Sequence, residues 1–250
     1  MNLNSIYKKL INLNQSQRSS AIALIDPDVK NNNILERIIN TINSSSFDVI
    51  FVGGSIIMDH LFEERLNFIK SNTDLPVILF PGSSTQISRN ADALLFLSLI
   101  SGRNPQYLIG EHVQSAPKIY NLGLETIATG YILIDSGYKS SVEIMSNTTS
   151  IPLDKKDIIL AHALAGEYLG QKLIYLEMGS NSKKSIDPSL VRYVKDKITI
   201  PLIIGGGIKT RKSAELISKA GADFIVISSL IEESYNDLEI KDICNTIHGN

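Results

Sequence analysis

Cysteine, tryptophan and an excess of charge are scarce or absent in this sequence of 250 residues. Cys244 is the single cysteine, and tryptophan does not occur. One cysteine excludes a disulfide within the chain and is typical of a reducing compartment. The formal net charge is -2, so the overall charge does not indicate a protein that binds nucleic acid or an anionic membrane.

No stretch of the sequence reaches the length of a membrane span. The longest apolar runs, such as ALLFLSLI at residues 93–100, are far shorter than the roughly 18 residues that a transmembrane helix needs. The N-terminal stretch MNLNSIYKKLINLNQSQ is amphipathic and lacks the apolar core of a signal peptide. We expect a soluble, cytoplasmic protein in which residues 1–20 form a helix before the first strand.

Two common kinds of catalytic site are also missing. The histidines at positions 60, 112, 162 and 248 have no metal-ligand spacing between them, and no Ser/His/Asp arrangement stands out. We interpret His162, which lies in the helical pattern ILAHALAGEYLG, as structural. Cys244, near the C-terminus, is a poor candidate for a nucleophile.

Eight short apolar runs alternate with longer segments of helical period. Continuous runs of Val, Ile and Leu are typical of parallel strands that are covered on both faces. Eight strand–helix units in this length predict one (β/α)₈ TIM-type barrel domain over residues 1–250, with an open doubly wound sheet as the alternative. The runs are AIALI (21–25), DVIFVGGS (48–55), PVILF (76–80), ADALLFLS (91–98), ETIATGYILI (125–134), KLIYLE (172–177), IPLIIGGG (200–207) and ADFIVISS (222–229).

Two segments interrupt this alternation. Residues 81–90, PGSSTQISRN, read as a loop where a helix would follow the third strand. Residues 135–153 are rich in Ser, Thr and Asn, and they predict a long loop or lid above the mouth of the barrel.

Carboxylates and small residues collect where the predicted strands end. In barrels of this kind the C-terminal ends of the strands build the active site. A single such turn is also explained by the preference of turns and helix caps for Gly, Ser and Asp, but six at one end predict a site. The ends read IDPD (25–28), VGGS (52–55), FPGSS (80–84), EMGSN (177–181), GGG (205–207) and SS (228–229).

The turns after the seventh and eighth strands predict a phosphate site. Glycine lets backbone amides approach an anion without a Cβ in the way, and amides at a helix N-terminus favour negative charge. Many unrelated barrel enzymes bind phosphate with these two loops. The pattern therefore indicates a phosphorylated ligand without identifying it.

Three acidic residues at strand ends differ in what they predict. Asp26 suits Mg²⁺, which takes one or two carboxylates together with substrate phosphates and water, and Ser55 on the neighbouring strand adds an oxygen. We interpret Asp28, which follows Pro27, as an ordinary turn residue. Glu177 directly follows the hydrophobic run LIYL, and burying a carboxylate is costly unless something pairs with it.

Six segments carry a resemblance to a known family. ALIDPD, FVGGS, PVILFPGSSTQIS, SGRNPQYLIGEHV, HALAGEYLGQKLIYLEMGSN and PLIIGGGIKT occur in this order between about Ala21 and Glu232. Together they resemble the geranylgeranylglyceryl phosphate synthases, the prenyltransferases of archaeal lipids, which also have bacterial members. The length of the chain and its HALAGEYLG segment resemble the larger of the family's two groups.

The resemblance implies a fold, a reaction and a set of contacts. It implies a TIM-type barrel in which irregular chain replaces the helix after strand three. It implies Mg²⁺-dependent transfer of a geranylgeranyl group from its diphosphate to the C3 hydroxyl of sn-glycerol 1-phosphate, by a homo-oligomer. Asp26 and Ser55 match the metal site. The glycerol-phosphate contacts match Tyr175, Leu176, Glu177, Met178, Gly179, Ser180, Asn181, Gly206, Gly207, Ser228 and Ser229.

This chain departs from the family pattern at three of those positions. Ser228 and Ser229 stand where the family usually has Gly followed by Asn or Thr, and Asn181 stands where it usually has Gly. A left-handed backbone at Ser228 would be strained, whereas Asn tolerates that conformation better. We expect these changes to alter affinity more than reaction type.

The prenyl transfer that the resemblance implies suggests a role for Glu177. Our hypothesis is that it hydrogen-bonds the glycerol hydroxyls and accepts the proton of the attacking one, while Tyr175 helps to fix the acceptor. The prenyl chain needs an apolar groove, for which the candidates are Phe96, Leu99, Ile100, Tyr131 and Ile134, although each also reads as barrel core. Arg89 and Arg103 are candidate diphosphate contacts, with surface placement as the alternative.

Other functions stay open at this point. The enzyme could accept a longer prenyl diphosphate, such as heptaprenyl diphosphate. A phosphosugar isomerase or lyase would share the phosphate site, as would a phosphate-ligand binder without catalytic activity. We expect small-molecule substrates and no nucleic-acid partner. Because the product would be a lipid, peripheral contact with a membrane is one way in which it could be released.

Overall fold

The computed structural model describes residues 5–179, 182, 185–234 and 236–250. Eight parallel strands pair in the order β1 to β8, and β1 pairs with β8 to close the barrel. Closure confirms the predicted TIM-type barrel and rules out the open sheet. The strands are β1 Ser20–Ile25, β2 Val49–Val52, β3 Val77–Leu79, β4 Ala93–Leu99, β5 Glu125–Leu133, β6 Leu173–Glu177, β7 Leu202–Gly205 and β8 Phe224–Ile227.

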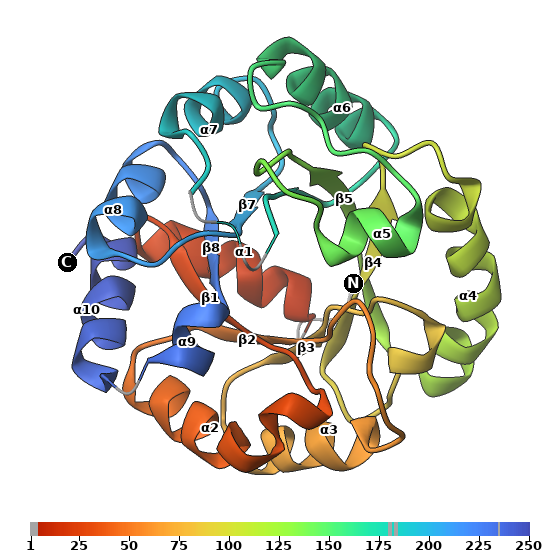
Figure 1. Cartoon of the computed structure of the whole chain (residues 1–250), viewed down its shortest axis with the longest axis vertical. Helices are drawn as coiled ribbons and strands as arrows, with labels where there is room; N and C mark the ends of the chain where they lie inside the picture. The colour runs from red at the N-terminus through yellow and green to blue at the C-terminus, as the bar shows by residue number, and fades with distance from the viewer. Residues whose placement is uncertain (1–4, 180–181, 183–184, 235) are drawn as a thin grey trace.

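Most of the helices form a ring around this barrel, whereas α1 lies across one end of it (Figure 1). The helices are α1 Ile6–Ser16, α2 Leu35–Ser44, α3 Phe62–Ser71, α4 Glu111–Leu122, α5 Ser141–Ser146, α6 Lys156–Tyr168, α7 Pro188–Lys195, α8 Arg211–Lys219, α9 Ser229–Glu233 and α10 Asp237–His248. Short turns of other helical types are η1 Val29–Ile34, η2 Ser84–Gln86 and the π-helical turn η3 Gln106–Gly110. Within the described ranges, no helix combines the length and the apolar character that crossing a membrane requires.

Each strand contributes alternate side chains to two hydrophobic layers, because successive side chains of a strand point to opposite faces. On β6, Leu173 and Tyr175 belong to the cluster inside the barrel. Ile174 and Leu176 belong to the cluster between the strands and the surrounding helices. Both layers are apolar, which is why the strands read as continuous hydrophobic runs rather than alternating ones.

Helix α1 closes the amino end of the barrel. The Glu125 carboxylate, at the start of β5, accepts hydrogen bonds from Ser5 Oγ (2.6 Å) and from the backbone N–H groups of Ile6 (2.7 Å) and Tyr7 (3.0 Å). Ile6 and Leu10 pack against the interior cluster. The predicted N-terminal helix therefore covers the end of the barrel opposite the polar strand ends. We propose that residues 1–250 form one domain around this barrel.

The segment between β3 and β4 has no α-helix, as the resemblance implied; only the short turn η2 interrupts it. Gln86 organises this stretch with a side chain that is 2% exposed. Its amide donates to the Gly54 carbonyl (2.7 Å) and accepts from the N–H groups of Gly54 (3.2 Å) and Gly82 (3.3 Å). One buried amide thus satisfies backbone groups of the loops after β2 and β3.

The segment 135–153 is more ordered than the loop that the sequence predicted. It contains helix α5, whose N-terminus carries a capping box formed by Ser140 and Glu143. The Glu143 carboxylate also accepts hydrogen bonds from the backbone N–H and the hydroxyl of Ser150, at 3.1 and 2.8 Å. The capping residues were readable in the sequence, and they explain why this Ser- and Thr-rich stretch forms a helical turn.

Candidate active site

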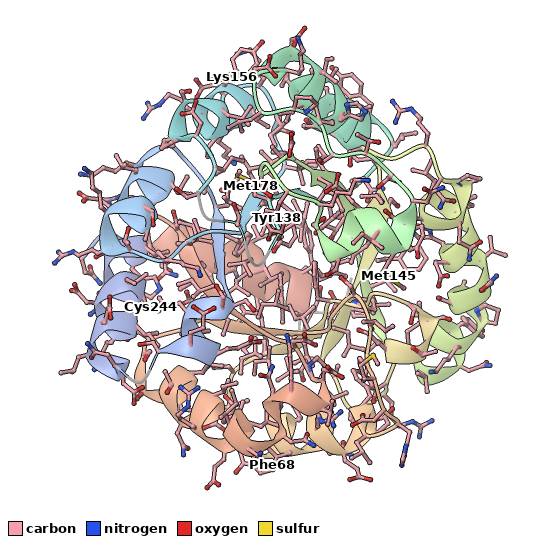
Figure 2. All side chains as sticks on the ribbon, viewed as in Figure 1. Phe68, Tyr138, Met145, Lys156, Met178 and Cys244 are labelled. Carbon is pink, nitrogen blue, oxygen red and sulfur yellow. The ribbon has the colours of Figure 1, made fainter. Side chains whose placement is uncertain are left out.

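Two cavities adjoin at the carboxyl end of the strands, one polar and one apolar. They share Gly54, Ser55, Phe80, Tyr131 and Val142 in their walls. Loops after β1, β2, β5, β7 and β8 surround the polar cavity, and Figure 2 shows Tyr138 near the centre of the barrel mouth. A ligand with one polar and one apolar part could therefore extend from one cavity into the other.

The polar cavity brings together most of the site residues that the sequence predicted. Glu177 and Tyr175 of β6 line it with Asp26, Ser55, Gly179, Gly206, Gly207, Ser228 and Ser229. Ser180 and Asn181 lie outside the described residues. Sequence reasoning missed Lys30, Tyr138, Lys139, Ser140, Glu232 and Glu233, which also line the cavity.

Leu176 and Met178 do not line either cavity with their side chains. Both side chains are buried in the layer between the strands and the helices. The alternation of the strand sends Tyr175 and Glu177 inward and Leu176 and Met178 outward. A ligand contact at these two positions would therefore have to use the backbone.

Glu177 ends β6 with its carboxylate inside the barrel, where the residue is 6% exposed. Its Oε1 accepts a hydrogen bond from the Gly179 N–H at 2.5 Å. Burial raises the pKa of this carboxyl group to about 7, although Tyr175 and the backbone N–H groups of Gly179 and Met178 offset part of the increase. A carboxylate with a pKa near neutrality is suited to exchange a proton at physiological pH.

Three aromatic rings pack beside Glu177. The Tyr131 and Tyr175 ring centroids lie 5.3 Å apart, and Phe80 lies 5.5 Å from Tyr175. Burial, and then the charge of Glu177, raises the pKa of both tyrosines well above the usual value. The two hydroxyl groups therefore stay protonated and can act as hydrogen-bond donors.

Glycines leave room for the groups at the bottom of the polar cavity. A Cβ at Gly205 would overlap the Tyr175 hydroxyl and the Glu177 carboxylate. Gly206 has a φ of +89°, and a Cβ there would lie 2.8 Å from Glu177 Oε1. Ser228 has a φ of -130°, so the left-handed strain considered for this serine does not arise.

Asp26 offers a carboxylate oxygen to the same cavity. Its Oδ2 forms an ion pair with Lys30 Nζ at 2.7 Å. Its Oδ1 is buried without a hydrogen-bond partner among the described residues, and a Cβ at Gly54 would lie 2.5 Å from it. Burial raises the pKa of Asp26 despite the opposing effect of Lys30. An unpaired oxygen beside Ser55 fits the hard oxygen ligands that Mg²⁺ prefers.

No cluster of three or more His, Cys, Asp or Glu residues suited to a metal ion occurs in the described part of the chain. Mg²⁺ commonly takes one or two carboxylates and completes its shell with substrate phosphates and water, so Asp26 with Ser55 remains compatible with it. Asp28 Oδ1 instead accepts a hydrogen bond from the Met58 N–H at 2.8 Å, which agrees with its interpretation as a turn residue.

The apolar cavity is bordered by the loop between β3 and β4, by β4 and by α4. Its volume is about 130 Å³, below the range of about 300–1,000 Å³ that is usual for small-molecule sites. Its wall includes Ile87 from the loop between β3 and β4, together with Ser115 and Ile119 from α4. Met145 of α5 also lines it, at the position labelled in Figure 2.

Three of the five predicted groove residues line this cavity: Phe96, Leu99 and Tyr131. Ile134 is buried between the strands and the helices, and Ile100 packs against that same layer. Each of these two isoleucines faces away from the barrel interior. They are core residues, as the alternative interpretation held.

The two candidate diphosphate arginines line neither cavity. Arg89 is exposed. Arg103 is also exposed, donates to the Gly102 carbonyl at 2.7 Å and lies 3.2 Å from His162 Nε2. The structure therefore favours surface placement for both. Cys244 is buried in α10, and burial raises the pKa of its thiol.

The fold and the site define a TIM-type barrel with a polar cavity next to an apolar one. The family model described as "PcrB family" matches residues 14–247. This chain belongs to the PcrB family.

Relatives and solved structures agree with that assignment. The chain is 43% identical to a geranylgeranylglyceryl phosphate synthase from Chitinophaga pinensis, covering 98% of this chain and 97% of the relative. It is 41% identical to the synthase of Thermofilum pendens, with 86% and 84% covered. The crystal structure of (S)-3-O-geranylgeranylglyceryl phosphate synthase from Thermoplasma acidophilum in complex with sn-glycerol-1-phosphate superposes with a TM-score of 0.93, at 34% identity and with 99% and 100% covered. These findings confirm the family resemblance and the prediction of a transferase.

Proposed function

We propose that this enzyme transfers a geranylgeranyl group from geranylgeranyl diphosphate to the C3 hydroxyl of sn-glycerol 1-phosphate, releasing diphosphate. The observation that carries the proposal is the buried Glu177, whose pKa is raised to about 7 in the polar cavity that adjoins an apolar one. The names of the relatives supply the substrate class.

Sn-glycerol 1-phosphate would occupy the polar cavity. The phosphate would bind at the turns of Gly206, Gly207, Ser228 and Ser229, with the cation of Lys139 in the same wall. Its hydroxyl groups would then reach Glu177 and Tyr175. Gly179 would contribute its backbone, as would Leu176 and Met178, whose side chains point away. Ser180 and Asn181 complete the proposed set.

The prenyl diphosphate would lie across both cavities. Its tail would enter the apolar cavity, and its diphosphate would lie at the shared wall beside Ser55 and close to Asp26. A tail longer than geranylgeranyl, such as heptaprenyl, is the main alternative within this function.

Asp26 and Ser55 would hold Mg²⁺ at that shared wall. The unpaired Asp26 Oδ1 is the oxygen that fits this role. When bound, Mg²⁺ supplies a positive charge that stabilises the departing diphosphate. Lys30, the ion-pair partner of Asp26 Oδ2, opposes the effect of burial on the pKa of this carboxyl group.

Glu177 would act as the general base of the reaction. The bond between C1 of the prenyl group and the diphosphate breaks, the C3 oxygen of the glycerol forms the new ether bond, and the proton of that hydroxyl passes to Glu177. The aromatic rings of Tyr175 and Tyr131 would exclude water and keep the carboxylate in a low-dielectric environment, and the Tyr175 hydroxyl would help to fix the acceptor. A positioned base contributes about 10²–10⁴-fold to rate.

We also propose that the enzyme is a homo-oligomer in the cytoplasm and that it contacts the membrane peripherally to release its product. The membrane contact is supported by Ile56 and Met58 after β2 and by Ile144 and Met145 of α5, because these side chains are exposed on segments that border the two cavities. Flotation with phosphatidylglycerol vesicles tests it, and Ile144→Asp should lower the bound fraction more than Leu238→Asp on α10.

The experiment that tests the reaction uses purified protein, Mg²⁺, sn-glycerol 1-phosphate and prenyl diphosphates of increasing length, with the sn-3 isomer as the control. Ether product from the sn-1 isomer alone is expected, and the preferred tail length would identify the donor. Absence of product with every donor would overturn the proposal and favour the phosphosugar isomerase or lyase.

A further inference from the structure

Arg65 is a buried arginine of α3 that lines neither cavity. Its side chain is 5% exposed, which is unusual for a cation unless it is fully engaged by partners. The residue has no role in the reaction proposed above. Its contacts, however, all lead to the two loops that carry Asp26 and Ser55.

The guanidinium group of Arg65 bonds to the loop after β1 and to the loop after β2. It donates to the Pro27 carbonyl at 2.9 Å and to Asn32 Oδ1 at 2.6 Å, both after β1. It also forms a two-pronged pair with Asp59 after β2, at 2.7 and 2.5 Å. This pairing lowers the pKa of Asp59 to about 2, so the carboxylate is ionised at all physiological pH values.

The two loops meet again next to the metal-binding residues. The Met58 N–H donates to Asp28 Oδ1 at 2.8 Å, which adds a second cross-link between the loops. Asp26 directly precedes Pro27, and its Oδ1 packs so closely on Gly54 that a Cβ there would lie 2.5 Å away. A small shift of one loop past the other would therefore change where Asp26 and Ser55 point.

We propose that Arg65 is a positioning residue for the diphosphate side of the active site. It holds the loops after β1 and β2 in register, so that Asp26 Oδ1 and Ser55 face one ligand together. This inference rests on the proposed function, because it takes Asp26 and Ser55 as the residues that bind Mg²⁺ and diphosphate. Arg65 itself touches neither ligand.

The planar fork of arginine is essential to this role. Arg65 uses separate N–H groups for Pro27, Asn32 and Asp59, and lysine cannot reproduce that geometry although it keeps the charge. Loss of a residue that orients a metal ligand typically costs 10–100-fold in metal affinity or activity. Sn-glycerol 1-phosphate would bind on the other side of the cavity, at turns that Arg65 does not contact.

The test measures binding without turnover, by calorimetric titration of the protein. In one series the protein is titrated with inorganic pyrophosphate in the presence of Mg²⁺, and in the other with sn-glycerol 1-phosphate. We expect Arg65→Met to weaken the affinity for Mg²⁺–pyrophosphate by about 10–100-fold and to leave that for sn-glycerol 1-phosphate within about twofold of wild type. Arg65→Lys should give an intermediate loss, since it retains the charge but not the fork.

Arg37→Met provides a matched control. Arg37 of α2 donates to the backbone carbonyls of Ile231, Glu232 and Ser234 near α9, so it also holds a loop, but on the phosphate side. Its loss should leave the affinity for Mg²⁺–pyrophosphate within about twofold of wild type. Thermal melts of all three variants show how much of each effect comes from stability.

Two results would overturn the inference while leaving the proposed function intact. One is wild-type affinity for Mg²⁺–pyrophosphate in Arg65→Met. The other is an equal loss for both ligands that follows the loss of thermal stability, which is what a purely structural arginine would produce. Failure of the wild-type protein itself to bind Mg²⁺–pyrophosphate would instead overturn the proposed diphosphate site, and this inference with it.

Discussion

The polar and apolar cavities lie side by side and share part of their walls, yet they are built from different parts of the sequence. The polar cavity uses residues at the very ends of strands, among them Asp26, Glu177 and Gly206. The apolar cavity uses the middle of β4, helices α4 and α5, and the loop that stands in place of a helix. The polar cavity is thus formed mainly by turns, and the apolar cavity by the side chains of one strand, two helices and a loop.

The charges of the two cavities differ in the same way. Asp26, Lys30, Lys139, Glu177 and Glu232 are among the charged residues that line the polar cavity. Glu111 is the charged residue in the apolar wall, and its carboxylate accepts hydrogen bonds from Gln106 Nε2 (2.9 Å) and the Ser84 N–H (3.3 Å). Because the two cavities differ in this way, we expect substitutions in the polar cavity to affect catalysis and binding of the phosphorylated acceptor. Substitutions in the apolar cavity should affect binding of the prenyl tail alone.

The largest effect is expected from Glu177→Gln. The amide cannot accept the proton, so kcat should fall by about 10²–10⁴-fold, while sn-glycerol 1-phosphate still binds. Steady-state kinetics and calorimetry measure the two quantities. Glu125→Gln, at the closed end of the barrel, is the control and should leave kcat of the folded enzyme unchanged. Turnover of Glu177→Gln within a few-fold of wild type would exclude Glu177 as the base.

Gly206→Ala should come next. The substitution places a Cβ 2.8 Å from Glu177 Oε1 at a φ of +89°, and such backbone strain costs about 1–3 kcal/mol. We expect the affinity for sn-glycerol 1-phosphate to fall by about 5–150-fold. Gly170→Ala is the matched control, because Gly170 has a φ of +88° and nothing within 4 Å of its Cβ position. Equal losses in both variants would attribute the effect to stability.

Ser115→Phe should affect the apolar cavity alone. Ser115 is 6% exposed and faces the cavity from α4, so a larger side chain reduces the room for the prenyl tail. Overpacking costs about 1–3 kcal/mol, so we expect KM for geranylgeranyl diphosphate to rise about tenfold. Geranyl diphosphate and sn-glycerol 1-phosphate should be unaffected. Gln114→Phe, on the exposed face of α4, is the control; a similar change there would contradict this assignment of the cavity.

The smallest effect is expected from a change of pH around neutrality. It should act on the polar cavity, through Glu177, and not on the apolar cavity. The Glu177 pKa is raised from 4.5 to about 7, so kcat/KM should rise with pH up to about 7 and then level off. The folded state binds this proton more tightly than the unfolded state. Stability is therefore lost as pH rises from 4.5 to about 7, by up to about 3 kcal/mol. Glu177→Gln should remove both dependences, and persistence of the stability slope in that variant would assign it to another group.

The sequence predicted the barrel well because strand formation here depends on local pattern. Each apolar run became a strand, and the serine-rich stretch 81–90 remained without an α-helix. Helix α5 was missed, although Ser140 and Glu143 stand at the spacing of a capping box. The capping box spans only four residues, and it does not stand out in a segment that is rich in Ser, Thr and Asn.

The site was predicted in part. The glycines that follow β6 and β7 line the polar cavity and have a left-handed φ, which is a local requirement that the sequence can indicate. The inward or outward direction of Leu176, Met178, Ile100 and Ile134 was not resolved, because that depends on the register of a closed sheet. Lys30 and Lys139 carried no signal, as surface lysines are common in any loop.

By itself the sequence determined the eight strands, the turns that expose backbone amides and the acidic residues that end β1 and β6. Only the tertiary structure decided that Glu177 is buried enough to reach a pKa of about 7, that Asp26 keeps one oxygen unpaired, and that Arg65 joins two loops. Closure of the barrel is the physical reason. It brings residues from distant parts of the chain into one water-poor space, and burial and pairing there depend on neighbours that no local pattern records.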